Sequence, residues 1–177
     1  IKLPNGTSYE QPTGLFINGE FVKSKSGKTF EVINPTNEEK IVAVEEADDQ
    51  DVEVAVQAAE KAFKKWSTVD PQVRAKALLK LADLVEENAE LLAAIESLAN
   101  GKALQCSKID LQIVVSYIRS AAGYADKVDG RAIKTGDDYV TYTKREPLGV
   151  VGAVIHWKLP LMVWLWQIGP ALTTVST

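Results

Sequence analysis

The sequence predicts an α/β fold that begins with β-hairpins, continues through four helices and closes with a strand-to-helix unit. Three observations support this prediction. Short apolar runs alternate with turn residues up to about residue 44, and apolar residues then recur every three or four positions over 50–130. A continuous apolar run follows at 150–155 and leads into a proline and an apolar helix. A buried strand that leads into a helix is the first half of a βαβ unit.

Two hairpins are predicted in the first part of the chain. The segment LFINGEFV, residues 15–22, places Asn18-Gly19 between two short apolar runs, which is typical of a type I′ turn. A second hairpin or paired strand is expected from Thr29 to Val44, with a turn at Asn34-Pro35. The chain therefore opens with β structure.

Four amphipathic helices are predicted next. The first covers 50–66, and the second begins after Asp70-Pro71, which supplies an N-cap and a proline at the first helical position. The third covers about 88–100 and the fourth about 107–128, and each is followed by a glycine that can end it.

Residues 131–146 predict an exposed or edge strand, because their side chains are polar or amphipathic on both faces. Such a strand can pair with another chain. The run at 150–155 predicts a strand buried on both faces in a parallel sheet, and Pro160 is well placed to start a helix at 161–172 that Gly169-Pro170 bends or ends. The returning parallel strand is expected to lie beyond residue 177.

Composition excludes several classes of function. The net charge of −4 gives no electrostatic reason to expect a nucleic acid or an anionic membrane surface as partner. The apolar segment 159–172 is shorter than the ~20 residues of a membrane-spanning helix, so a buried core helix is predicted instead. One cysteine allows no intrachain disulfide, and the first residues carry no signal or transit pattern. No metal site is predicted.

The order of motifs resembles that of the aldehyde dehydrogenase superfamily, and most closely that of its fungal cytosolic and mitochondrial enzymes. The resemblance covers nearly all of the chain. The motifs that carry it are LPNG, YEQPTGLFIN, the INP turn, ESLANGK at 96–102, YADKVDG at 124–130 and EPLGVVGAVIHWKLP at 146–160.

The resemblance implies an N-terminal portion of an enzyme that uses NAD or NADP. By the same resemblance, 1–130 is the first part of the cofactor-binding domain, 131–146 an oligomerisation strand and 147–177 the first strand-helix unit of an incomplete Rossmann-like sheet. It further implies that Ile155, His156, Trp157 and Lys158 line the cofactor groove, and that Lys158 occupies the position of the asparagine that stabilises the developing oxyanion.

The sequence departs from the family pattern after residue 155. His156 replaces a proline, Lys158 an asparagine and Leu159 a phenylalanine. Gln167 and the closing residues 173–177 replace the usual lysine and glycine-asparagine, so Val175 places a β-branched side chain where the turn requires φ > 0. A lysine still offers a positively charged donor to an oxyanion, on a longer and more flexible stem than the amide.

Two functions remain open from the sequence. The first is a part of an enzyme that oxidises aldehydes to carboxylic acids through a cysteine thiohemiacetal and thioester, with the nucleophile outside these residues. Cys106 does not match that nucleophile, and a structural role is predicted for it. The second is an inactive truncated relative that serves as a binding or assembly partner through its exposed strand. The resemblance implies a homodimer or homotetramer, in the cytoplasm or the mitochondrial matrix.

Overall fold

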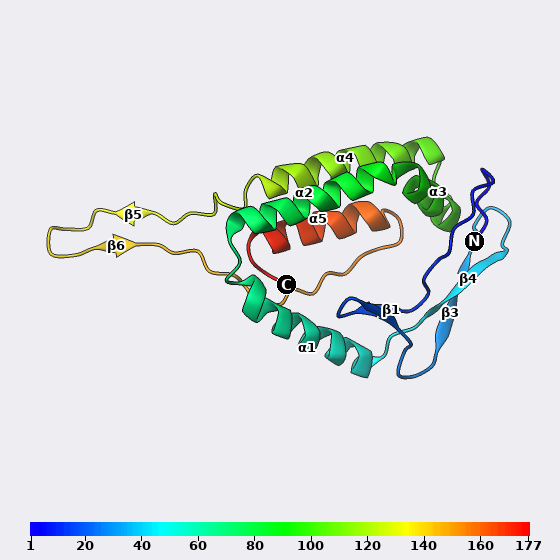
Figure 1. Ribbon diagram of the computed structural model, residues 1–177, viewed down its shortest axis with the longest axis horizontal. Coiled ribbons are helices and arrows are strands. Elements are labelled where there is room, and N and C mark those ends of the chain that lie inside the picture. The colour runs from blue at the N-terminus through cyan, green and yellow to red at the C-terminus, as the bar shows by residue number, and fades with distance from the viewer.

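A computed structural model describes all residues, 1–177, and has a mixed α/β architecture. Helices α2 (Pro71–Glu87), α4 (Leu104–Ala122) and α5 (Pro160–Thr173) pack side by side. Figure 1 shows the N-terminal hairpins at one end of this group and another hairpin that projects from the other end. The predicted fold class is confirmed.

The first hairpin forms as the sequence predicts. Strand β1 (Leu15–Ile17) pairs antiparallel with β2 (Glu20–Val22). Asn18 and Gly19 both have positive φ, 53° and 87°, as a type I′ turn requires.

The second hairpin joins β3 (Thr29–Ile33) to β4 (Lys40–Glu45) and leads into α1 (Asp49–Trp66). The buried carboxylate of Asp51 ties this helix to the loop before β3, because it accepts hydrogen bonds from the Ser24 hydroxyl at 3.0 Å and the Lys25 amide at 3.1 Å. The Asp48 amide also donates to it, and this bond is the main cause that lowers the pKa of Asp51. Asp51 thus fixes the start of α1.

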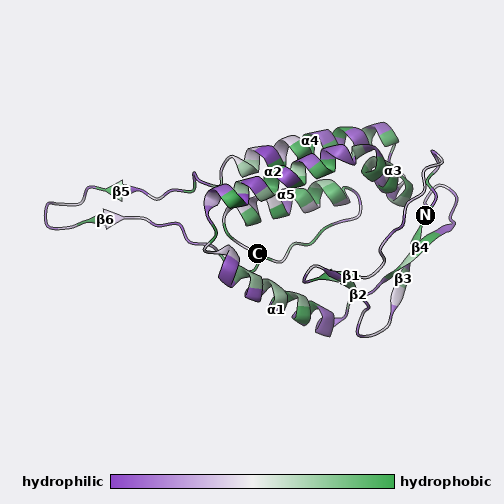
Figure 2. Ribbon diagram, viewed as in Figure 1, coloured by the Kyte–Doolittle hydropathy of each residue, from purple (hydrophilic) through white to green (hydrophobic).

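The apolar core lies between α2, α4 and α5, with α3 (Ala89–Asn100) covering one end. Leu78, Leu111, Ile118 and Leu165 are its largest fully buried side chains. Figure 2 shows that α5 is predominantly apolar, whereas α1, α2 and α4 alternate between apolar and polar residues. Burial of one apolar face per helix holds the group together.

Helix α5 differs from the predicted fully buried helix. Its Met162 and Leu165 face the core, but Trp164 and Trp166 are 43% and 40% exposed. Pro170 lies inside the helix, which continues to Thr173. None of the helices is long and apolar enough to cross a lipid bilayer.

Helix α4 ends at Ala122, six residues before the predicted end at 128. The following residues form tight turns, and Ala125 is buried. The Arg74 side chain from α2 donates to the Ala125 carbonyl at 3.0 Å. This bond directs the Ala125 carbonyl toward α2 rather than along the axis of α4.

The single strand predicted over 131–146 is a hairpin. Strands β5 (Ala132–Ile133) and β6 (Thr141–Tyr142) pair antiparallel, and the chain reverses between them around Gly136. In Figure 1 this hairpin, which we call the arm (residues 131–146), extends away from the helices. The prediction of exposure is confirmed, since Val140 and Tyr142 are 92% and 70% exposed.

The strand predicted at 150–155 does not form. The Val151 amide donates to the Thr177 carbonyl at 2.7 Å, and the Thr177 amide donates to the Gly149 carbonyl at 3.0 Å. These two bonds flank Val150 as in one rung of a parallel ladder. The apolar run therefore pairs at Thr177 alone, no neighbour lies beside its remaining residues, and Val154 is 95% exposed.

Val175 has φ 74°, as its position in the turn after α5 predicts. The left-handed region costs an L-residue about 1–2 kcal/mol, and a β-branched side chain makes it less favourable still. We expect Val175→Gly to raise the free energy of unfolding by about 1 kcal/mol, because glycine removes the strain but gains entropy when unfolded. Urea unfolding of the variant and the unmodified protein measures the difference in the free energy of unfolding. Val140→Gly in the exposed arm is the control, and an equal gain there would contradict the strain at Val175.

Candidate functional site

The four residues that the resemblance assigns to the cofactor groove lie immediately before α5. Ile155 is half-buried, while His156, Trp157 and Lys158 are exposed. Residues 157–159 form the turn itself, and Pro160 begins the helix. We call residues 156–159 the α5 turn.

His156 has a structural role in this turn. Its Nδ1 accepts a hydrogen bond from the Leu159 amide at 3.3 Å. Leu159 is the N-cap residue of α5 and its own side chain makes no capping bond, so His156 satisfies an amide at the helix entrance. Proline, the residue implied by the family pattern, has no side-chain acceptor to do this.

A bond that the sequence did not indicate joins the α5 turn to α3. The Asn100 side-chain amide donates to the Lys158 carbonyl at 3.3 Å across 58 residues of sequence. Asn100 is the last residue of α3. The sequence pattern identified this region only as a helix end, and nothing in it predicts the contact with Lys158.

The surface beside the turn is apolar and open. The Trp157 indole is 82% exposed, Val154 is 95% exposed and Val151 is 39% exposed. A planar aromatic ring with an exposed face can stack on a flat ligand. Lys158 adds a positive charge next to this surface, and a primary ammonium can donate to phosphate or to an oxyanion.

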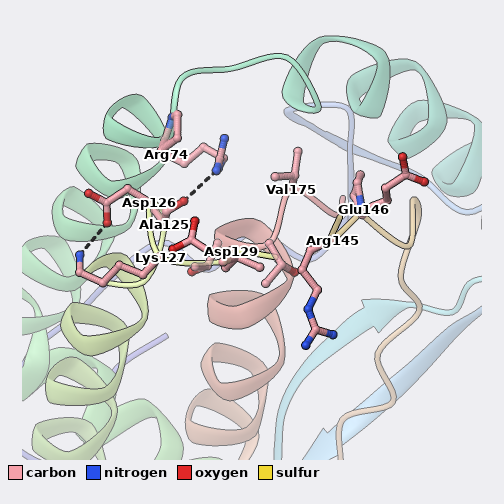
Figure 3. A pocket seen from close by; sticks show the side chains of 13 residues that line it. Arg74, Ala125, Asp126, Lys127, Asp129, Arg145, Glu146 and Val175 are labelled. Atoms are coloured by element: carbon pink, nitrogen blue, oxygen red, sulfur yellow. Dashed lines mark hydrogen bonds and ion pairs between the residues drawn. The ribbon is translucent and has the colours of Figure 1, made fainter. Parts of the chain in front are cut away.

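An open pocket lies elsewhere, at the base of the arm. It has a volume of about 660 Å³ and lies between the start of α2, the turns after α4 and the end of α5. Figure 3 shows Arg74 and Ala125 on one side of it and Arg145, Glu146 and Val175 on the other. None of the residues 155–158 lines this pocket.

The charges around this pocket mostly serve the fold. Arg74 is 5% exposed and donates to the backbone carbonyls of Val69, at 2.5 Å, and Ala125. Lys127 pairs with Asp126 at 2.6 Å, and this hydrogen bond is the main cause that lowers the pKa of Asp126 (Figure 3). Acidic and basic groups alternate along the lining, so we assign the chemical site to the α5 turn rather than to this pocket.

The single cysteine does not join the α5 turn. Cys106 is exposed in the first turn of α4 and makes no side-chain hydrogen bond. No group of three or more His, Cys, Asp and Glu side chains is arranged to hold a metal ion. The candidate site therefore consists of an apolar surface, a positive charge and helix-entrance backbone.

Comparisons with known proteins agree on one family. The model of the aldehyde dehydrogenase family matches residues 21–177. An aldehyde dehydrogenase of Aspergillus niger is 51% identical over the whole chain, which covers 36% of that relative's length. The chain thus spans about a third of the length of its curated relatives.

Solved structures give the same result. A putative aldehyde dehydrogenase from Burkholderia cenocepacia superposes with a TM-score of 0.92 at 38% identity, over 95% of this chain and 35% of that one. An aldehyde dehydrogenase from Bacillus cereus, solved as an NAD⁺ complex, gives a TM-score of 0.91 at 42% identity over 94% of this chain and 35% of that one.

Proposed function

Because the chain belongs to the aldehyde dehydrogenase family, we propose that it forms part of an enzyme that oxidises aldehydes to carboxylic acids with NAD(P). The exposed α5 turn is the observation that carries this proposal, since its apolar surface and positive charge suit a dinucleotide. Similarity to a structure solved with NAD⁺ supports the choice of cofactor.

The residues present fit such a cofactor. Trp157 and Val154 offer exposed apolar side chains to a planar ring, and Ile155 between them is half-buried. His156 fixes the backbone at the helix entrance through its bond from Leu159. Bound NAD(P) supplies the electron acceptor for the oxidation.

In this proposal the Lys158 ammonium donates a hydrogen bond to the oxyanion that develops on the aldehyde oxygen. A fixed donor at such a position contributes on the order of 3 kcal/mol to lowering the barrier. The side chain of Lys158 is exposed and makes no ion pair, so it is free to reach a ligand. In this proposal the nucleophilic cysteine comes from a part of the relatives' length that these residues do not span.

The test is aldehyde-dependent formation of NAD(P)H by the protein that carries this chain, followed by absorbance at the reduced nicotinamide band. Oxidation of a panel of aliphatic and aromatic aldehydes supports the proposal. A folded protein that binds NAD(P) but oxidises none of them contradicts it, and favours the inactive assembly partner instead.

The arm supports a proposal about assembly. Its exposed Tyr139, Val140 and Tyr142 form no contact with the helical body that would bury them, and two-residue strands alone are marginal in water. Exposed apolar side chains on a projecting hairpin are typical of a protein interface. We therefore include a homo-oligomer, held in part by the arm, in the proposed function.

We expect Val140→Asp to weaken self-association about tenfold, because a carboxylate must lose its water at the interface. Sedimentation velocity across a concentration series measures the change. Val52→Asp on α1 is the matched control, since Val52 is also exposed, at 56%, but lies far from the arm. Equal dissociation by both variants, or by neither, would argue against an interface at the arm.

A further inference from the structure

We infer that Asn100 is a positioning residue for the proposed site, because its side chain holds the Lys158 carbonyl and thereby orients the α5 turn. This inference rests on the proposed function, which places the cofactor beside Trp157 and Lys158. Asn100 itself touches neither reacting groups nor cofactor in this assignment. It acts through the backbone of the turn.

Both polar atoms of the Asn100 side-chain amide are hydrogen-bonded. Its Oδ1 accepts a hydrogen bond from the Lys102 amide at 2.8 Å, and its Nδ2 donates to the Lys158 carbonyl at 3.3 Å. A backbone N–H requires an acceptor and a carbonyl requires a donor, so only one orientation of the side-chain amide satisfies both. The network itself therefore determines which atom faces Lys158.

Lys102 is in turn held in place more firmly than an ordinary surface residue. Its Nζ lies 2.6 Å from the Asp110 carboxylate on α4 and also binds the buried Glu96 of α3. Its carbonyl accepts a hydrogen bond from the Ser97 hydroxyl. These contacts fix the Lys102 backbone, and with it the N–H that orients Asn100.

The backbone between the two residues has little freedom. Gly101 ends α3 with φ 75°, a conformation that L side chains rarely adopt. A Cβ on Gly101 would lie 2.9 Å from Cγ of Pro35 in the β3–β4 turn. The segment Asn100-Gly101-Lys102 is thus clamped between α3, α4 and the second hairpin.

The α5 turn, by contrast, has few anchors of its own. Within it, His156 accepts from Leu159, and Leu159 accepts the first bond of α5 from the Val163 amide. Apart from that bond to α5, the bond from Asn100 is the one hydrogen bond that joins residues 156–159 to another element. Loss of this bond leaves the orientation of Trp157 and Lys158 to the turn alone.

The test uses Asn100→Asp in the full protein that carries this chain. Aspartate keeps the acceptor for the Lys102 amide but loses the donor to Lys158. Asn88→Asp is the matched control, because Asn88 also donates its side-chain amide to a backbone carbonyl, that of Leu84 at 2.8 Å, at the distant α2–α3 junction. Both variants make the same change in charge.

Two measurements are compared between the variants. Hydrogen exchange of peptides covering 156–161 is expected to accelerate roughly 3- to 10-fold in Asn100→Asp and to stay unchanged in Asn88→Asp. The KM for NAD(P) is expected to rise by a similar factor in Asn100→Asp alone. A merely destabilised enzyme loses active molecules and hence kcat, whereas a disordered cofactor turn raises KM.

The inference is overturned if exchange at 156–161 is unchanged in Asn100→Asp, or if the control shifts exchange and KM equally. If the unmodified protein oxidises no aldehyde, only the proposed function is contradicted, because the exchange measurement still reports whether Asn100 orders the turn. If oxidation is normal but exchange in Asn100→Asp is unaltered, only the positioning role is contradicted.

Discussion

Lys102→Met is expected to lower the free energy of unfolding by about 3–5 kcal/mol, which corresponds to a fall in melting temperature of about 10 °C. Lys102 lies between Glu96, whose side chain is 3% exposed, and Asp110, whose side chain is 20% exposed. Without the ammonium, the buried carboxylate of Glu96 and the partly buried carboxylate of Asp110 have no positive partner. The free-energy cost of removing them from water is then not compensated by an ion pair.

Lys108→Met, on α4, is the control. Lys108 pairs with Glu90 at 2.7 Å, but the Glu90 side chain is 81% exposed, so this variant is expected to lose less than about 1 kcal/mol. Equal losses from the two variants would show that the buried ion pairs contribute no more than a surface pair. Differential scanning calorimetry distinguishes these results.

The Lys102 ammonium also makes the stability of the fold depend on pH in the alkaline range. Burial disfavours the charged form of Lys102, but the hydrogen bonds that its ammonium donates to Asp110 and Glu96 outweigh burial and raise the pKa of Lys102 above its ordinary value. A raised pKa in the folded state gives stability that is complete below the unfolded pKa, near 10.5, and is lost as pH rises through the folded value. Lys102→Met should lack this alkaline loss, and calorimetry between pH 9 and pH 12 tests it.

Leu165→Ala is expected to cost about 3 kcal/mol, with a fall in melting temperature of about 6–12 °C. Leu165 is fully buried and is the one residue of α5 among the ten that form the central core cluster. Its removal leaves a cavity where α5 meets α2 and α4. Because α5 carries the candidate turn at its start, looser packing should also weaken binding of NAD(P).

Leu84→Ala provides the comparison for this variant. Leu84 lies on α2 and is 44% exposed, so the same truncation opens no enclosed cavity and is expected to cost less than about 1 kcal/mol. Urea denaturation of both variants gives the difference. A small loss at Leu165, equal to that at Leu84, would mean that α5 is not held by the shared core.

Local patterns in the sequence predicted most helices and hairpins because short-range physics determines them. Asn18-Gly19 supplies two residues that tolerate positive φ, and Asp70-Pro71 supplies a cap and a compatible first residue. The strand at 150–155 was predicted wrongly for a different reason. An apolar, β-branched run indicates burial, but a strand also needs neighbouring backbone, and here only Thr177 provides it.

Two boundaries were missed, the end of α4 and the reversal inside the arm. Arg74 binds the Ala125 carbonyl from 51 residues away. Gly123, the C-cap residue of α4, is a local signal for the earlier end, but the prediction placed the end before Gly130 instead. The arm was predicted as one strand because alternation continues through it, although Gly136 with two aspartates after it could have indicated a reversal.

The candidate site was predicted only by resemblance, and only as far as its surface residues. Ile155 to Lys158 do lie together, as consecutive residues must, but their role as a cofactor groove remains a proposal. Periodicity could not reveal that Asn100 reaches Lys158, because the contact crosses 58 residues. The positive φ of Val175 also followed from the resemblance, because the family pattern has glycine in this turn.

Because the arm projects, the accessibility of its tip depends on whether the arm is covered by a partner. Residues 135–140 form an exposed reversal that contains glycine and two aspartates, far from the helical core in Figure 1. Such loop tips are preferred sites of proteolytic cleavage and tolerate inserted segments well. A partner that covers the arm would shield this tip, so the rate of limited proteolysis there would follow the fraction of associated molecules. A short epitope inserted at the tip could likewise mark free chains without disturbing the helices that carry the α5 turn.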